Sequence, residues 1–206
     1  MSQPILWYFV DPMCSWCWGF APTFEKVRDA FEDQVRIAFI MGGLRPGGKD
    51  PVTSSFRDDI LHHWHEVEKT TGASFNFEAA MPEGFIYNTE IPSRAIIAVS
   101  EISPEETYPY YKSIQEAFYK DSVDITQEEH LVMFAERHGL KPGEFKESFH
   151  SDAMLEKTVE HFKKAREFGV RGFPTLILQP DEGYHLITNG YRSYDDIRLK
   201  LESALM

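Results

Sequence analysis

Cysteine is almost absent from this chain. Cys14 and Cys17 are the two cysteines among 206 residues, and they stand three positions apart. A structural zinc site needs four ligands and usually a second pair of cysteines, which this sequence lacks. A structural disulfide between the two would close a four-residue loop and add little stability. The scarcity and the Cys-x-x-Cys spacing together predict a redox-active dithiol rather than a packing or metal-binding role.

Basic residues are also fewer than acidic ones. The chain has 21 Lys and Arg against 33 Asp and Glu, which gives a formal net charge of -12. Its basic residues are scattered, so we predict no nucleic-acid partner. The sequence further lacks a Gly-x-Gly-x-x-Gly loop, a P-loop and a serine nucleophile elbow. Dinucleotide-binding, P-loop and serine-hydrolase chemistry are therefore not indicated.

The start of the chain lacks the features of a targeting segment. No basic residues precede the apolar run Ile5–Val10. That run is far shorter than the roughly 20 residues that cross a bilayer. The segment is therefore neither a signal peptide nor a transmembrane span, and we expect a cytoplasmic protein without a membrane partner. The sequence carries no signal for a particular oligomeric state.

The surroundings of the two cysteines indicate how they would react. Ile5–Val10 reads as a strand that ends directly before the pair, and residues 15–32 read as a helix. The N–H groups and the positive dipole end of a helix N-terminus stabilise a thiolate. We expect Cys14 to be an exposed nucleophile and Cys17, one turn into the helix, to attack the mixed disulfide formed on Cys14. The charge of Asp11 would oppose thiol ionisation if it lies close, which leaves the net effect open.

A second signature lies near the other end of the chain, at Gly172-Phe173-Pro174-Thr175. Proline donates no ladder hydrogen bond, so a proline that opens a strand is confined to its start or to a sheet edge. A cis Phe173–Pro174 bond fits this position. It would leave the backbone of Phe173 free to pair with an extended substrate.

The order of elements in the whole chain reads β-α-β, a helical insertion, then β-β-α. Further strands are predicted at 35–41, 175–178 and 184–188, helices from about 52 to 168, and a last helix after Ser193. Within the insertion, Ser93 is expected to cap a short helix. The last inserted helix is expected to bury one apolar stripe, composed of Leu155, Val159, Phe162, Ala165 and Phe168.

This order, with Asp-Pro-x-Cys-x-Trp-Cys-Trp-Gly at 11–19 and Gly-x-Pro-Thr at 172–175, resembles a thioredoxin fold with a helical insertion. The chain is similar to the DsbA-like superfamily, in particular to its cytoplasmic, FrnE-like branch of predicted protein-disulfide isomerases. The resemblance spans almost the whole chain. It implies an α/β fold, a mixed sheet flanked by helices, with a large all-helical insertion. The thioredoxin-like domain would comprise 1–50 and 169–206, and the inserted domain 51–168.

The resemblance also implies the site. Cys14 would be the nucleophile, Cys17 the resolving thiol, and Pro174 the cis-proline packed against them. Phe173, and Trp16 if it is exposed, would contact the substrate, a thiol- or disulfide-containing protein or small molecule. No bound cofactor or metal is implied, and glutathione or another thiol system would be the redox partner. Ser15-Trp16 differs from the Pro-His pair of the periplasmic oxidant, so oxidase, reductase and isomerase directions stay open.

Two other functions remain alternatives. One is a glutathione-dependent isomerase or transferase of the 2-hydroxychromene-2-carboxylate isomerase type, although such relatives typically replace the cysteine pair with serine or a single cysteine. The other is a redox-sensing adaptor that binds a protein partner.

Clustered histidines and aromatic residues have simpler interpretations. His62, His63 and His65 could ligate a metal with Glu66, but we favour a polar helix face that flanks a buried Trp64. We expect Trp7 and Trp18 to belong to the core. The tyrosines at helical spacing are expected to pack rather than to bind a cofactor; they are Tyr108, Tyr110, Tyr111 and Tyr119.

Overall fold

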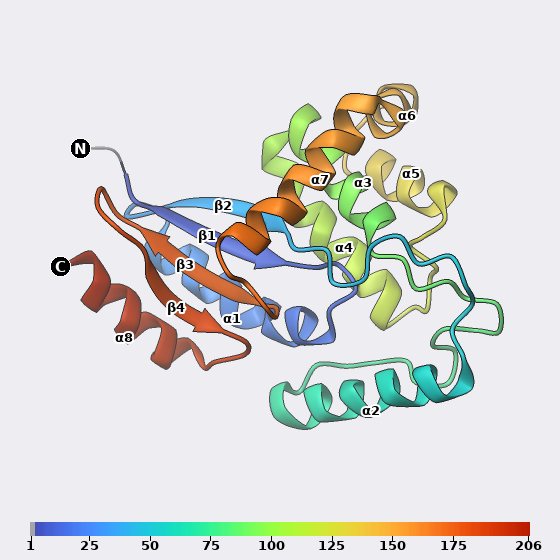
Figure 1. Ribbon diagram of the computed structural model, residues 1–206, viewed down its shortest axis with the longest axis horizontal. Helices are drawn as coiled ribbons and strands as arrows, with labels where there is room; N and C mark the ends of the chain where they lie inside the picture. The colour runs from blue at the N-terminus through green and yellow to red at the C-terminus, as the bar shows by residue number, and fades with distance from the viewer. Residues whose placement is uncertain (1–2) are drawn as a thin grey trace.

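The computed structural model describes residues 3–206 and places a four-stranded sheet among helices (Figure 1). The first part of the chain forms β1 (Ile5–Val10), α1 (Ser15–Phe31) and β2 (Arg36–Met41). The inserted part forms α2 (Ser54–Thr71), α3 (Glu90–Ile102), η1 (Pro104–Glu106), α4 (Thr107–Tyr119), α5 (Glu128–Arg137), α6 (Pro142–His150) and α7 (Asp152–Glu167). The chain then returns to the sheet with β3 (Thr175–Gln179) and β4 (His185–Asn189) and ends in α8 (Tyr194–Leu205).

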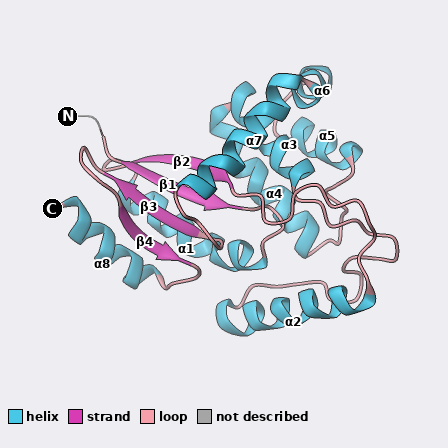
Figure 2. Ribbon diagram, viewed as in Figure 1, coloured by secondary structure: helices cyan, strands magenta, loops and turns pink. Residues whose placement is uncertain are grey.

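The sheet has the strand order β2-β1-β3-β4. β1 runs parallel to β2 and antiparallel to β3, and β4 is antiparallel to β3. A parallel pair needs a crossover connection, which α1 provides. The mixed sheet predicted from the sequence is confirmed, as is the position of the insertion between its second and third strands (Figure 2).

Alternating side chains of β1 divide the core between the two faces of the sheet. Leu6 and Tyr8 belong to the large cluster that α1 and α8 also supply. Phe9 points to the opposite face and packs with Ala165 of α7 and with Ile177. The sheet is therefore covered by α1 and α8 on one side and by α7 on the other.

The inserted helices differ from the sequence expectations in three places. Ser93 does not cap α3, because the helix starts one turn earlier, where Asn88 accepts the Glu90 N–H at 3.1 Å; Ser93 itself is buried inside the helix. The nine-residue α6 was not predicted. On α7, Leu155 and Val159 are 40% and 59% exposed, because the buried stripe runs through Met154, Thr158, Phe162 and Ala165 instead.

The aromatic residues mostly pack as expected. Trp64, Tyr110, Tyr111 and Tyr119 are buried, and Tyr108 is half-buried. Trp7 and Trp18 are half-buried rather than fully enclosed, because each indole N–H reaches a polar partner near the surface, the Gln179 side chain and the Ser74 carbonyl.

In Figure 1, α3, α4, α5 and α6 lie beyond the ends of β1 and β2, α7 reaches back over the sheet, and α2 is set apart from the others. α2 packs on α1, and α7 packs on β2, so the inserted helices are in direct contact with the elements that precede the insertion. The division into a discontinuous domain of 1–50 and 169–206 and an inserted domain of 51–168 stays a prediction. Within the described residues, no helix has both the length and the apolar character required to cross a bilayer.

One close approach joins the end of β2 to the loop before β3. The Cα of Gly42 lies against the ring of Phe173, so that a β-carbon at position 42 would overlap ring atoms. A glycine at this position therefore lets the 173–174 loop sit against β2.

We predict that Gly42→Ala lowers the free energy of unfolding by about 1–3 kcal/mol, because the ring must move out of a packed site. Urea denaturation of the purified protein measures the change. Gly143→Ala in α6 is the matched control: nothing lies near its added β-carbon, and we expect it to be neutral or to stabilise by up to about 1 kcal/mol. Equal losses in both variants would contradict the packing argument.

Candidate functional site

The cysteine pair lies at the start of α1, directly after β1. Cys14 is the N-cap residue, with extended backbone angles of φ -90 and ψ 112. Its sulphur accepts the backbone N–H of Cys17 at 3.3 Å, and its carbonyl accepts the N–H of Trp18 at 3.1 Å. Both cysteines are free thiols. One N–H of the first helical turn, that of Cys17, therefore points at the Cys14 sulphur, in agreement with the predicted position of Cys14 at the helix N-terminus.

The two thiols differ in accessibility. Cys17 is 0% exposed and Cys14 is 6% exposed, so the expectation of a well-exposed Cys14 is wrong. The reason is that the 173–174 loop and inserted residues enclose the turn, which the local sequence does not reveal. Burial raises the pKa of the Cys17 thiol well above its ordinary value, and the adjacent Cys14 sulphur raises it further. The Cys17 thiol is therefore held in its protonated form.

The Gly-x-Pro-Thr segment at 172–175 lies next to the cysteine pair. The Phe173–Pro174 peptide bond is cis, as predicted. The Cys14 thiol donates to the Phe173 carbonyl at 3.6 Å, a contact between residues 159 positions apart. Trp16 is half-buried and lines the same cavity as Cys14 and Phe173. The structure thus brings the predicted site residues into one region, while their roles remain predictions.

Asp11 is a further residue of the site, with a structural role that the sequence does not predict. Its carboxylate is fully buried and accepts the Met13 N–H at 2.9 Å and the Leu44 N–H at 2.7 Å. Burial raises the pKa of Asp11 to about 7, against the opposing effect of these hydrogen bonds. The sequence signal is an acidic residue directly after an apolar strand. The sequence gives its charge but does not reveal that it joins the cysteine turn to the loop after β2.

Residues of the insertion also hold the cysteine turn. The hydroxyl of buried Tyr87 donates to the Met13 carbonyl. Gln115 of α4 donates to the Pro12 carbonyl at 3.4 Å. Neither residue could be linked to the cysteines by motif or spacing, because both contacts are long-range. The geometry of the turn therefore depends on the inserted helices as well as on β1 and α1.

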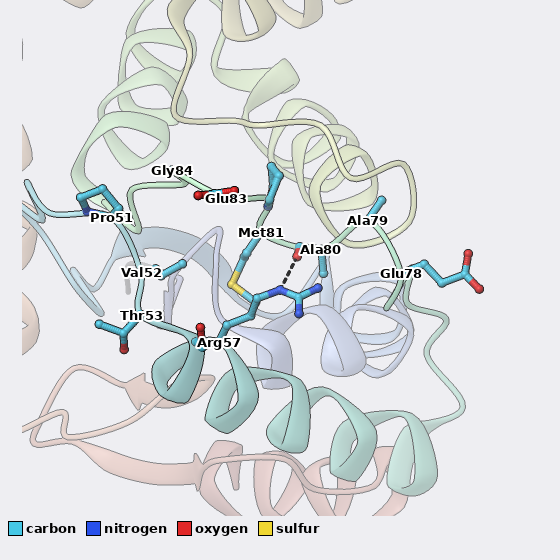
Figure 3. Close-up of a pocket in the computed structure, with 12 residues that line it drawn as sticks. Pro51, Val52, Thr53, Arg57, Glu78, Ala79, Ala80, Met81, Glu83 and Gly84 are labelled. Atoms are coloured by element: carbon cyan, nitrogen blue, oxygen red, sulfur yellow. Dashed lines mark hydrogen bonds between the residues drawn. The ribbon is translucent and has the colours of Figure 1, made fainter.

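A cavity of about 360 Å³ opens beside Cys14. Its walls come from the cysteine turn, the 173–174 loop, the loop after β2, one side of α2 and the segment before α3; they are formed by Met13, Cys14, Ser15, Trp16, Leu44, Arg45, Phe56, Ile60, His63, Trp64, Tyr87 and Phe173. A larger cavity of about 750 Å³ lies between the start of α2 and residues 78–84, where Arg57 donates to the Ala80 carbonyl at 2.9 Å (Figure 3). Neither cysteine lines that larger cavity, so the smaller one is the candidate site.

The histidine cluster on α2 has the contacts of a polar helix face. His62 and His63 lie 3.6 and 3.5 Å from Glu66 carboxylate oxygens. His65 lies 4.0 Å from Glu68 and stacks on Phe77 at 3.9 Å between ring centroids. These partners agree with the interpretation of a solvated face beside buried Trp64.

Comparison with solved structures shows the same fold in other proteins. A Nitrosomonas europaea protein, provisionally assigned as a protein disulfide isomerase, is 40% identical with a TM-score of 0.92, and the match covers 99% of this chain and 98% of that one. The cytosolic disulfide reductase DsbM from Pseudomonas aeruginosa, also solved with GSH, is 24% identical with a TM-score of 0.78 over 98% of both chains. At that identity the likeness to DsbM shows the fold alone.

The curated proteins that the chain resembles are named adapter proteins, not disulfide isomerases or reductases. The ClpXP adapter protein SpxH from Halalkalibacterium halodurans is 27% identical over 181 residues, which is 85% of this chain and 58% of that protein. SpxH from Bacillus subtilis is 24% identical over 200 residues, 92% of this chain and 64% of that protein. The chain thus spans less than two thirds of the length of these two relatives.

A family model covers most of the chain: the DSBA-like thioredoxin domain matches residues 5–202. This match includes both cysteines, the cis-proline loop and all the inserted helices. Together with the structural likeness, it confirms the predicted thioredoxin fold with its helical insertion. The chain belongs to the family of DSBA-like thioredoxin domains.

Proposed function

We propose that this protein is a thiol–disulfide oxidoreductase in which Cys14 and Cys17 form the redox pair. The observation that carries the proposal is the position of the Cys14 sulphur, which accepts the Cys17 N–H at 3.3 Å and lies 3.6 Å from the Phe173 carbonyl. Negative charge on this sulphur is favoured by the N-terminus of α1. The carbonyl beside it is a backbone acceptor for an extended substrate.

The asymmetry of the two thiols supports different roles. Cys14 faces the cavity, so its thiolate can attack one sulphur of a substrate disulfide, form a mixed disulfide and release the other half as a thiol. Cys17 is buried behind it with a raised pKa, which disfavours attack on an outside substrate. Cys17 then attacks the Cys14 sulphur, releases the second thiol and leaves the Cys14–Cys17 disulfide. The two electrons of the dithiol have then moved to the substrate.

The redox partner in this proposal is glutathione or another thiol system, acting without a bound cofactor. Support comes from DsbM, a protein of the same fold that has been solved with GSH and is named a cytosolic reductase. We accordingly propose a cytoplasmic location and thiol- or disulfide-containing proteins or small molecules as substrates. The reduction potential of the pair sets the direction, from about -270 mV for a thioredoxin-like reductant to about -120 mV for a strong oxidant.

A second candidate is an adaptor that binds a protein partner. The observation that favours it is the similarity to ClpXP adapter proteins over 85% of the chain. A double variant, Cys14→Ser with Cys17→Ser, separates the two functions. An adaptor would still bring down a defined partner from lysate with this variant, whereas disulfide exchange would be lost.

We predict that Cys14→Ser reduces disulfide exchange to the uncatalysed background, because serine supplies no thiolate. Cys17→Ser should instead accumulate the mixed disulfide on Cys14, because the resolving thiol is missing. Mass spectrometry after incubation with glutathione disulfide would show one added glutathionyl group on Cys17→Ser and none on Cys14→Ser. Unchanged unfolding midpoints are the control for folding. Full exchange activity in Cys14→Ser would contradict the proposal.

We predict that Asp11 makes the protein less stable as pH rises. Its pKa of about 7 in the folded protein lies above the ordinary value of 3.8, so the folded state binds the proton more tightly. The stability from this group is complete below pH 3.8 and is lost as pH rises through 7. At 1.36 kcal/mol per pKa unit, the loss between pH 4 and 8 is on the order of 3–4 kcal/mol.

Asp11→Asn should remove this part of the pH dependence, which chemical denaturation between pH 4 and 8 measures. Asparagine keeps one carbonyl acceptor but loses the second, so a constant loss of stability is expected at all pH values. Asp59→Asn on the exposed surface of α2 is the control and should leave the slope unchanged. If the slopes of Asp11→Asn and the unmodified protein are the same, Asp11 does not titrate in this range.

A further inference from the structure

The cavity beside Cys14 has the size and walls of a small-molecule site. Its volume of about 360 Å³ lies within the range of ligand pockets. Apolar side chains supply most of the wall, including Phe56, Ile60 and Trp64 of the inserted helix α2. Cys14 and Phe173 line the same cavity, and the Cys14 sulphur lies 3.6 Å from the Phe173 carbonyl. A ligand in the cavity can therefore contact both the redox pair and α2.

No acidic side chain lines the cavity, although the chain carries 33 Asp and Glu. The ionisable side chains that could carry positive charge there are Arg45 and His63. His63 has a carboxylate partner, Glu66, at 3.5 Å. Across residues 3–206, Arg45 takes part in no ion pair, so its guanidinium is available to a ligand.

Arg45 is also held in place. Its guanidinium carbon lies 4.1 Å from the centroid of the Phe56 ring, a cation–π contact. Its backbone N–H donates to the Thr89 hydroxyl at 3.0 Å, and its carbonyl accepts the Thr89 N–H at 3.1 Å. Because the backbone of Arg45 is hydrogen-bonded and its guanidinium rests on a ring, the side chain loses little freedom when it binds a carboxylate, which it can do through two parallel hydrogen bonds.

We propose that this cavity binds low-molecular-weight disulfides that carry a carboxylate, and that Arg45 selects for their negative charge. The inference rests on the proposed function and adds its substrate class. The apolar wall takes the aliphatic part of the ligand, Arg45 takes the carboxylate, and the disulfide lies against the Cys14 sulphur. Disulfides of amino-acid and short-peptide thiols have this chemistry.

The reaction balances with the protein as the reductant. The Cys14 thiolate attacks the bound disulfide, forms a bond to one sulphur and expels the other half as a thiolate, which takes up a proton. Cys17 loses its proton, attacks the Cys14 sulphur and expels the second half. One disulfide is reduced to two thiols, and the dithiol is oxidised to the Cys14–Cys17 disulfide. A single turnover therefore needs no other reductant.

The test measures this single turnover with pre-reduced protein and three disulfides of different charge. Glutathione disulfide is anionic, hydroxyethyl disulfide is neutral, and cystamine is cationic. Arg45→Ala should lower the second-order rate constant for glutathione disulfide about fivefold, the equivalent of about 1 kcal/mol for an exposed ion pair. The constant for hydroxyethyl disulfide should not change. Arg45→Glu should lower the rate constant for glutathione disulfide further and raise the rate constant for cystamine.

A matched control is Arg137→Ala on α5. Arg137 also lies over an aromatic ring, 5.0 Å from the centroid of Phe134, but it does not line the cavity. It should leave all three rate constants unchanged. If Arg45→Ala changes all three by one factor, or changes none, the proposed charge selection is wrong.

Binding of S-methylglutathione, which cannot exchange, separates this inference from the proposed function. Calorimetry should detect binding to the unmodified protein that weakens in Arg45→Glu and is unaffected in Arg137→Ala. Such binding without any disulfide exchange would support the site while the proposed redox function fails. Exchange with no charge preference and no Arg45-dependent binding would overturn the site and leave the redox function standing.

Discussion

The antiparallel pairing of β1 with β3 is the constraint on which the site depends. Because Phe9 pairs with Thr175, the C-terminal end of β1 and the start of β3 lie side by side at the same end of the strands. The cysteine turn follows the first and the cis-proline precedes the second. The contact between Cys14 and the Phe173 carbonyl is a consequence of this register, and a slip by one residue would turn the side chains of β3 to the other face.

The insertion is part of the site rather than an appendage to it. Tyr87 and Gln115 hold backbone carbonyls of the turn before Cys14. Asp11 ties the same turn to the loop after β2, where Leu44 and Arg45 line the cavity. A buried carboxyl with a raised pKa costs stability at neutral pH, and its two backbone hydrogen bonds offset part of that cost. The cysteine turn is therefore fixed by groups from three separate stretches of chain.

The features that could be predicted are those encoded locally. The strand before Cys14, the helix after it and the cis-proline follow from short motifs, periodicity and proline chemistry. The low exposure of Cys14 and the partners of Asp11 and Tyr87 could not be predicted, because they depend on contacts between distant segments. On α7 the stripe through Leu155 and Val159 was wrong by one position, since both neighbouring faces carry apolar residues and packing on α3 and β2 decides between them.

The arrangement of the cavity has a consequence for how such a protein can diversify. The reactive sulphurs come from the junction of β1 and α1, whereas most of the other residues that line the cavity come from α2 and the loop that leads to it. The reacting cysteines and the residues proposed to select the substrate thus lie in separate stretches of sequence. Substitutions at Arg45, Phe56, Ile60 or His63 can alter what enters without touching the redox pair, so new specificities are accessible to gradual change.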